Sequence, residues 1–143
     1  MSPAIPLVAG LAAAAAGALP AQSLQKTRSM AEAQHEIAVL LIQKEEYRRA
    51  VDEAAKIFQM SWPDDQEAVL LKELRFFADQ FLHGAQPGYG IRLIEAVQGR
   101  FRDVKSRIAI SKEKGYLYKE MNQRDKALEC FREAQRLERD TAP

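Results

Sequence analysis

The side chains that could carry chemistry are few and far apart in this sequence. His35 and His83 could act as acid–base groups or metal ligands, but 48 residues separate them. We expect each to be a lone surface histidine, because catalysis needs a partner group held nearby. The single cysteine, Cys130, excludes an internal disulfide and a multi-cysteine zinc site. It stands beside Phe131 on an apolar stripe, where we expect a small core residue rather than a reactive thiol.

The short motifs of known catalytic and nucleotide sites are also missing. Gly88-Tyr89-Gly90 lacks the third glycine and the preceding strand of a dinucleotide-binding loop. Asp64-Asp65 could be a pair of catalytic carboxylates, but capping of the next helix by Asp64, with Glu67 three residues on, explains it without chemistry. We therefore predict no catalytic residue, no cofactor and no metal. A small enzyme with an unforeseen cofactor site is the weakest alternative.

The composition is that of one globular domain rather than a disordered chain. Of the 143 residues, 47% are hydrophobic and 29% are charged. The net charge of +1 favours neither a nucleic acid nor an acidic substrate. The charges are unevenly spread, with a net charge of −5 over residues 32–67 and +5 over residues 92–119. This polarity could steer a partner or favour head-to-tail self-contact, although solvated helix faces can also carry it.

The N-terminal segment differs from the rest, because residues 1–23 contain no charged side chain. Its apolar run from Ile5 to Leu19 would span about 22 Å as a helix, less than a hydrocarbon core of about 30 Å. This length favours a signal peptide, and Ala21-Gln22-Ser23 offers small residues for cleavage. No Lys or Arg precedes the run, so a retained membrane anchor or a docking helix is the alternative. We expect an exported (periplasmic or extracytoplasmic) or membrane-anchored protein.

Beyond this segment the apolar residues follow a helical period, and no alternating strand pattern occurs. The sequence predicts an all-α fold. Ser29 and Glu32 have the spacing of a capping box, which predicts that the first helix of the domain begins there. The apolar face expected on this helix consists of Ala33, Ile37, Leu40 and Leu41. Further helices are expected at residues 47–60, 64–82, 91–97 and 100–121, with a last helix after the turn at residues 122–125.

The last two helices, within residues 106–138, carry a specific pattern of small and aromatic residues. Gly115 stands three residues before Tyr118, and Ala127, Phe131 and Ala134 recur at steps of four and three on the second helix. This hairpin resembles a tetratricopeptide repeat. In that family, a small residue on each helix lets the pair cross closely, and an aromatic side chain fills the gap.

The same pattern recurs when the last unit is moved back by 37 residues and then by a further 40. The small residues expected on the first helices are Ala38, Ala78 and Gly115, and those opposite them are Ala50, Gly90 and Ala127. The resemblance gives a domain at residues 29–140 with units at about 31–63, 64–99 and 100–140. The spacings exceed the family period of 34, so the connections must be longer. We predict a short right-handed solenoid of helical hairpins, preceded by an apolar N-terminal helix.

The resemblance implies a concave wall made by the first helix of each hairpin. The positions expected on this wall are Glu32, His35, Val39, Ile42, Lys72, Arg75, Asp79, Leu82, Ala109, Lys112, Tyr116 and Lys119. Relatives that clamp a terminal carboxylate use asparagines here, where this chain has Val39, Asp79 and Tyr116, so that function is not expected. The residues expected to bind a partner are Lys72, Arg75, Lys112, Tyr116 and Lys119, with Asp79 as the only acid nearby.

These features predict a non-catalytic protein-binding scaffold, exported or tethered to a membrane. Its partner would be a protein or peptide, and the basic positions favour one with acidic groups. Neither a nucleic acid nor a small-molecule substrate is expected. The alternative is an accessory structural subunit of a membrane protein complex, in which residues 4–19 form a retained transmembrane or docking helix. A wall that is only solvated surface is the third interpretation.

Overall fold

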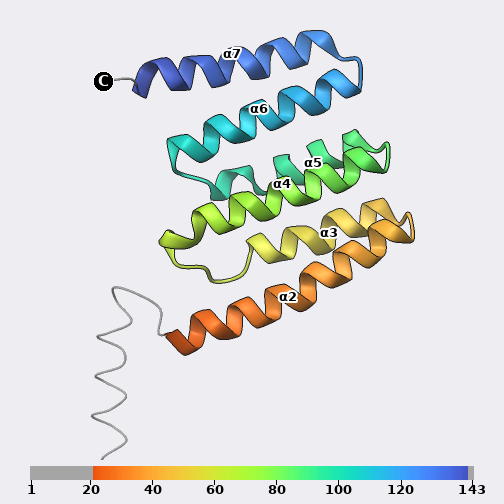
Figure 1. Ribbon diagram of the computed structural model, residues 1–143, viewed down its shortest axis with the longest axis vertical. Helices are drawn as coiled ribbons and strands as arrows, with labels where there is room; N and C mark the ends of the chain where they lie inside the picture. Colours follow the sequence, from red (N-terminus) through yellow and green to blue (C-terminus); the bar gives the residue numbers. More distant parts are fainter. Residues whose placement is uncertain (1–20, 142–143) are drawn as a thin grey trace, which may run out of the picture.

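The computed structural model describes residues 21–141, which form six α-helices and two short 3-10 segments and no strand. In chain order they are α2 (Ala21–Gln43), α3 (Tyr47–Phe58), η1 (Asp64–Gln66), α4 (Glu67–His83), α5 (Pro87–Val97), η2 (Gln98–Arg100), α6 (Val104–Glu120) and α7 (Arg124–Thr141). Figure 1 shows the helices stacked as the rungs of a ladder, with α2 at one end and α7 at the other. The all-α prediction is confirmed. The apolar helix expected at residues 4–19 lies outside the described residues.

Each of the three helical hairpins closes with the same backbone turn. One residue in each turn has a left-handed conformation, namely Glu45, Ala85 and Asn122, with φ of 62°, 59° and 60°. The next amide in each turn donates back to a carbonyl of the first helix, from Glu46 to Leu41 at 2.9 Å, from Gln86 to Phe81 at 2.8 Å and from Gln123 to Tyr118 at 2.9 Å. This bonding pattern satisfies carbonyls that the helix end leaves free. The turns recur at the same steps of 40 and 37 residues as the small side chains.

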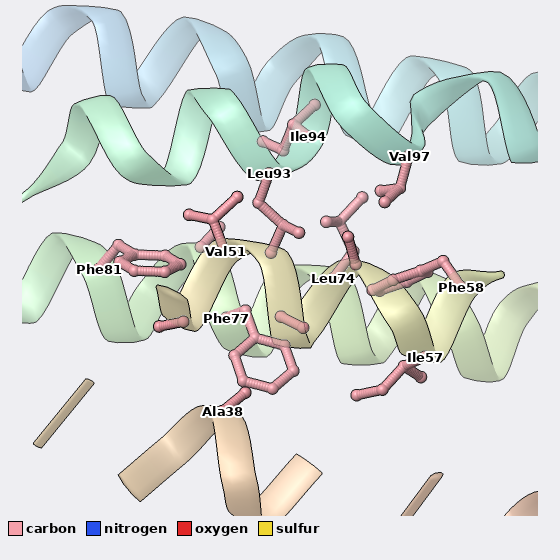
Figure 2. Packing of buried hydrophobic residues seen from close by; sticks show 14 of the residues in the cluster. Ala38, Val51, Ile57, Phe58, Leu74, Phe77, Phe81, Leu93, Ile94 and Val97 are labelled. Atoms are coloured by element: carbon pink, nitrogen blue, oxygen red, sulfur yellow. The ribbon is translucent and has the colours of Figure 1, made fainter. Parts of the chain in front are cut away.

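The core is thickest around the second hairpin, which has a neighbouring hairpin on each side. Figure 2 shows Leu74, Phe77 and Phe81 of α4 facing side chains of α3 and α5. All three, and Leu93 and Ile94 of α5, are at most 1% exposed. Burying each such side chain contributes roughly 1.5–3 kcal/mol to the stability of the fold. A hairpin of a solenoid buries these side chains only by packing against its neighbours, so its stability depends on them.

The predicted close approaches between helices are present. Ala38, Ala50 and Ala78 are fully buried at 0% exposure. A Cβ atom added to Gly115 would lie 2.7 Å from Cζ of Phe131, so the aromatic ring occupies the space that a side chain would need. A Cβ atom on Gly90 would lie 3.2 Å from Cδ1 of Leu117. The prediction of small residues at the helix crossings is confirmed.

The carboxylate of Glu67 connects the second hairpin to the third. The expectation that Asp64 and Glu67 cap α4 is wrong, because no side chain caps η1 or α4. Glu67 instead accepts hydrogen bonds from the backbone amides of Arg102, at 3.1 Å, and Asp103, at 2.9 Å. These two amides belong to the segment that leads into α6, so Glu67 fixes where that helix starts.

Two helix starts differ from the predicted ones. α6 begins at Val104 rather than at Arg100, because the preceding Phe101 is drawn into the core at 4% exposure. α5 begins at Pro87 rather than at Ile91. Proline suits the first turn of a helix, since its missing amide has no helical partner there.

The first helix differs most from expectation. The predicted capping box is wrong, because Ser29 lies inside α2, which is already helical from Ala21. The buried residues of α2 are Ala31, Ala38, Leu41 and Ile42, whereas Ala33, Ile37 and Leu40 are exposed. The buried face of α2 is therefore rotated about the helix axis relative to the expected face. Of the four residues expected on that face, only Leu41 is buried. The small residues considered for signal cleavage form the first turn of α2. None of the helices within residues 21–141 is long and apolar enough to cross a membrane.

Candidate protein-binding wall

The residues predicted to bind a partner all lie on the first helices of the second and third hairpins. Lys72 and Arg75 belong to α4, and Lys112, Tyr116 and Lys119 belong to α6. All five side chains are exposed, and α4 and α6 contact each other directly. We call these five residues the basic wall. Their positions along each helix differ by three, four or seven residues, which places them on one side of that helix.

Tyr116 is the aromatic residue of the basic wall. Its side chain is 54% exposed. The ring packs edge-on against Phe131 of α7, with 5.1 Å between the ring centroids. Phe131 also occupies the space next to Gly115, where α6 and α7 cross closely. Phe131 is therefore held in position, and it supports the ring of Tyr116. The ring is therefore held in place while much of its surface remains free.

Two of the four bases on the wall already face acids of this chain. Arg75 Nε lies 3.7 Å from Glu113 Oε1, and Lys112 Nζ lies 3.5 Å from Glu138 Oε1 on α7. Ion pairs of such exposed bases contribute little to stability, so both remain available to a partner. Lys72 and Lys119 have no acid within ion-pair distance among the described residues.

Glu113 corrects the expectation that Asp79 would be the only acid on this part of the wall. Its side chain is 15% exposed, between the two helices. Burial raises the pKa of the Glu113 carboxyl above its ordinary value, and the charge of Asp79 raises it further, while Arg75 lowers it. Glu113 thus places a partly buried acid among the bases and lowers the positive charge that a partner meets.

A groove lies between α2 and α4, and sequence reasoning did not predict it. Its volume is about 690 Å³, and we call it the α2–α4 groove. The residues that line it are Arg28, Ala31, Glu32, His35, Glu36, Ile57, Trp62, Val69, Leu70, Lys72, Glu73 and Phe76. Its two aromatic side chains, Trp62 and Phe76, were the signal that the sequence offered for it. Trp62 is fixed in the groove by a hydrogen bond from Nε1 to the carbonyl of Ile57, at 2.7 Å.

His35 forms one wall of this groove rather than standing alone on the surface. Its Nδ1 atom lies 2.6 Å from Glu73 Oε2, and its side chain is only 25% exposed. The ring also lies 4.8 Å from Phe76 and 5.2 Å from Phe77, between centroids. His35 therefore connects α2 to α4, and the expectation of a lone surface histidine is wrong for this residue. His83 is exposed at the end of α4, as expected.

The groove and the basic wall have opposite charge. Three acids line the groove, Glu32, Glu36 and Glu73, against two bases, Arg28 and Lys72. Lys72 lines the groove and also belongs to the basic wall, so the two surfaces are continuous across α4. A segment lying along α2, α4 and α6 would pass from an acidic apolar hollow to a basic surface with one aromatic ring.

Metal ligands and the thiol of Cys130 are the other groups that could carry chemistry. Within residues 21–141, no three His, Cys, Asp or Glu side chains are grouped so that they could hold a metal ion. Cys130 is half-buried rather than part of the core. Burial raises the pKa of its thiol, with Lys114 opposing, so the thiolate that would react is disfavoured.

Comparison with known proteins agrees with this geometry at its C-terminal end. Residues 113–141 match the family model of the tetratricopeptide repeat. The last hairpin therefore resembles a tetratricopeptide repeat. The matched segment runs from the middle of α6 through α7 and contains both Gly115 and Phe131. Neither a comparison with curated proteins nor one with solved structures found a match. Tetratricopeptide repeats typically bind other proteins and are generally not catalytic, so a protein-interaction scaffold is the function class that the fold suggests.

Proposed function

We propose that this chain is a non-catalytic scaffold that binds an acidic segment of another protein on the basic wall. The observation that carries the proposal is the exposed ring of Tyr116 between Lys112 and Lys119, held by Phe131. Aromatic residues such as Tyr116 and arginines such as Arg75 are enriched at protein interfaces, whereas exposed lysines act mainly by steering a partner of opposite charge.

The α2–α4 groove extends the site and defines the second part of the partner. Its apolar floor suits one large apolar side chain without an acidic neighbour, because Glu32, Glu36 and Glu73 line the groove. The acidic groups of the segment would begin at Lys72, on the border with the basic wall. The partner would therefore be an extended or helical segment with acidic side chains and one apolar anchor. Bases at the rim of such a site mainly set the association rate and its dependence on salt.

The first test reverses two charges of the basic wall. Lys112→Glu combined with Lys119→Glu should abolish capture of the protein that the wild type recovers from native extract, because both bases would then repel acidic groups. Capture by the wild type should also weaken as ionic strength rises above about 0.15 M. Recovered proteins are identified by mass spectrometry, and the main one is then titrated against each variant.

A matched control reverses two bases elsewhere. Arg132→Glu with Arg139→Glu changes the net charge by the same amount on the exposed side of α7, away from the basic wall. This variant should capture the same protein as the wild type, and circular dichroism should show helical content unchanged in both variants. Equal capture by all three proteins would refute the proposal.

A third variant should act in the opposite direction. Glu113→Gln removes the acid beside Arg75 and should tighten binding of the same partner by about two- to fivefold, the effect of one exposed ion pair. The affinity gain should shrink at acidic pH, where Glu113 of the wild type is itself protonated, because burial raises its pKa. Weaker binding by Glu113→Gln would contradict an acidic partner.

Export or membrane tethering is part of the same proposal and is supported by the uncharged N-terminal segment. Cleavage near Ser23 would give an exported protein that starts at about the first turn of α2. Retention of residues 4–19 would instead make the chain an accessory subunit of a membrane complex. The intact mass of the protein isolated from its native host distinguishes the two, and a full-length chain in the soluble cytoplasmic fraction would contradict both.

A further inference from the structure

Two polar contacts join α2 to the second hairpin at the α2–α4 groove. His35 Nδ1 lies 2.6 Å from Glu73 Oε2, and Arg28 Nη2 donates to Gln66 Oε1 over 3.3 Å. The first contact occupies one of the three carboxylates that line the groove. The second holds the guanidinium of Arg28 beside η1, next to the start of α4. These groups are therefore engaged within this chain and offer little to a partner.

Glu32 and Glu36 of α2 are the two groove acids without such a contact. Both side chains are exposed, and no base of residues 21–141 lies within ion-pair distance of either. They stand one turn apart on the same side of α2, an arrangement in which like charges repel each other. By contrast, Glu53 of α3 pairs with Lys56 one turn further on. Glu32 and Glu36, which we call the acidic edge, therefore lack a cation.

The floor beside the acidic edge is apolar and partly aromatic. Val69 is 49% exposed, and the rings of Trp62 and Phe76 are partly buried. Aromatic faces next to carboxylates suit arginine, because its flat guanidinium packs on a ring and donates to carboxylate oxygens. Its alkyl stem covers apolar surface at the same time. The groove therefore suits a basic side chain as well as an apolar one.

We propose that the α2–α4 groove binds a basic side chain of the partner, arginine in preference to lysine, next to the apolar anchor. The anchor would lie on the groove floor, and its basic neighbour would reach the carboxylates of Glu32 and Glu36. The acidic groups of the same segment would follow on the basic wall, beyond Lys72. This inference rests on the proposed function, and it gives the bound segment a basic end and therefore a direction.

The order of charges across the stack supports this direction. α2, α4 and α6 follow one another along the molecule (Figure 1), with the acidic edge on α2 and the bases of the basic wall on α4 and α6. The chain as a whole has the same polarity, with a net charge of −5 over residues 32–67 and +5 over residues 92–119. A segment of opposite polarity is attracted at both ends, whereas a wholly acidic segment is repelled by the acidic edge.

The first experiment uses synthetic peptides in which one leucine separates a pair of arginines from a run of glutamates, made in both chain directions. Companion peptides carry glutamines or glutamates in place of the arginines. Isothermal titration calorimetry measures their binding to the full chain. The arginine peptide should bind about three- to tenfold more tightly than the glutamine peptide, the effect of two exposed ion pairs, and the glutamate peptide should bind most weakly. Equal binding of the arginine and glutamine peptides would overturn the inference.

A pair of variants assigns the preference for arginine to the acidic edge. Glu32→Gln with Glu36→Gln should remove the difference between the arginine and glutamine peptides, because the carboxylates that bind arginine are gone. The control, Asp52→Asn with Glu129→Gln, removes the same charge from exposed positions of α3 and α7 that do not line the groove, and it should keep the difference. Circular dichroism verifies the helical content of both variants. A difference that persisted without the acidic edge would mean that the arginines bind elsewhere.

Trp62 reports occupation of the groove directly, because it is the only tryptophan of the chain. The peptides contain no aromatic residue, so all tryptophan emission comes from this side chain. Binding of the arginine peptide should shift the emission of Trp62 and reduce its quenching by acrylamide. Peptide binding that left both emission and quenching unchanged would show that the groove stays empty, and it would overturn the inference.

The variant Lys112→Glu with Lys119→Glu separates a failure of this inference from a failure of the proposed function. If this variant loses peptide binding but the arginines make no difference to the wild type, the acidic segment on the basic wall stands and its basic end is wrong. If the variant binds the arginine peptide as tightly as the wild type does, the groove acts alone and the acidic segment on the wall is wrong. Absence of binding by every peptide would overturn both.

Discussion

Gly115 shows how a single residue sets the distance between two helices. A Cβ atom there would lie between 2.7 and 2.9 Å from three atoms of the Phe131 ring, closer than real contacts allow. We expect Gly115→Ala to lower the free energy of unfolding by about 1–2 kcal/mol. Overpacking destabilises a core by about 1–3 kcal/mol. The better helix propensity of alanine offsets up to about 1 kcal/mol of this loss. Urea denaturation followed by circular dichroism measures the change.

A second change tests whether the Phe131 ring is the cause. In a double-mutant cycle, Gly115→Ala should cost less in a Phe131→Leu background, because the smaller side chain makes room for the new methyl group. Gly99→Ala is the matched control, since a Cβ atom at Gly99 would meet nothing within 4 Å. If Gly115→Ala were as harmless as Gly99→Ala, the close crossing of α6 and α7 would not depend on this glycine.

At the scale of the elements, Glu67 determines how the third hairpin joins the second. Burial alone would raise the pKa of Glu67, but the amides of Arg102 and Asp103 and the hydroxyl of Ser106 bring it below the ordinary value of 4.5. Glu67→Gln leaves one amide without its charged acceptor and should lower the free energy of unfolding at neutral pH by about 1–3 kcal/mol.

The sign of the pH dependence follows from the lowered pKa of Glu67. A carboxylate whose folded pKa lies below 4.5 contributes its stability above pH 4.5, and the contribution is lost as the pH falls through the folded value. The difference between wild type and Glu67→Gln should therefore shrink on acidification below about pH 4.5. Urea titrations across this pH range measure it, with the exposed Glu129→Gln as a control that should show little difference at any pH. A difference that stayed constant would mean that Glu67 does not act through its charge.

At the scale of the whole molecule, the array is asymmetric in both charge and hydrophobicity. The end near α2 carries the acidic groove and the exposed side chains Met30, Ile37 and Leu40, whereas α4 and α6 carry the bases of the wall. A solenoid buries the apolar faces of its inner helices through their neighbours, but its two end helices have only one neighbour each. Within residues 21–141, the outer side of α2 carries exposed apolar side chains, whereas the outer side of α7 is mostly polar.

The sequence by itself determined the number of hairpins and the positions where helices cross. The small residues Ala38, Ala78 and Gly115 could be recognised because two helices that cross closely need small side chains at a fixed spacing. This spacing is visible within the sequence of each hairpin. The basic wall was also predicted as exposed, because the positions of a first helix follow from that spacing. The positions of Glu45, Ala85 and Asn122 in left-handed turns could not be read from residue type, since none of them is glycine.

Only the tertiary structure decided which side of α2 is buried, what Glu67 binds and where the groove lies. The helical spacing of apolar residues in α2 is compatible with two apolar faces, one with Ala38 and Leu41 and one with Ile37 and Leu40. Only the first of these faces packs against neighbouring helices, and it is therefore the buried one. Glu67 and His35 meet partners 35 and 38 residues away, which no local pattern encodes. Helical periodicity fixes which residues share a face, but the packing of distant segments fixes which face turns inward.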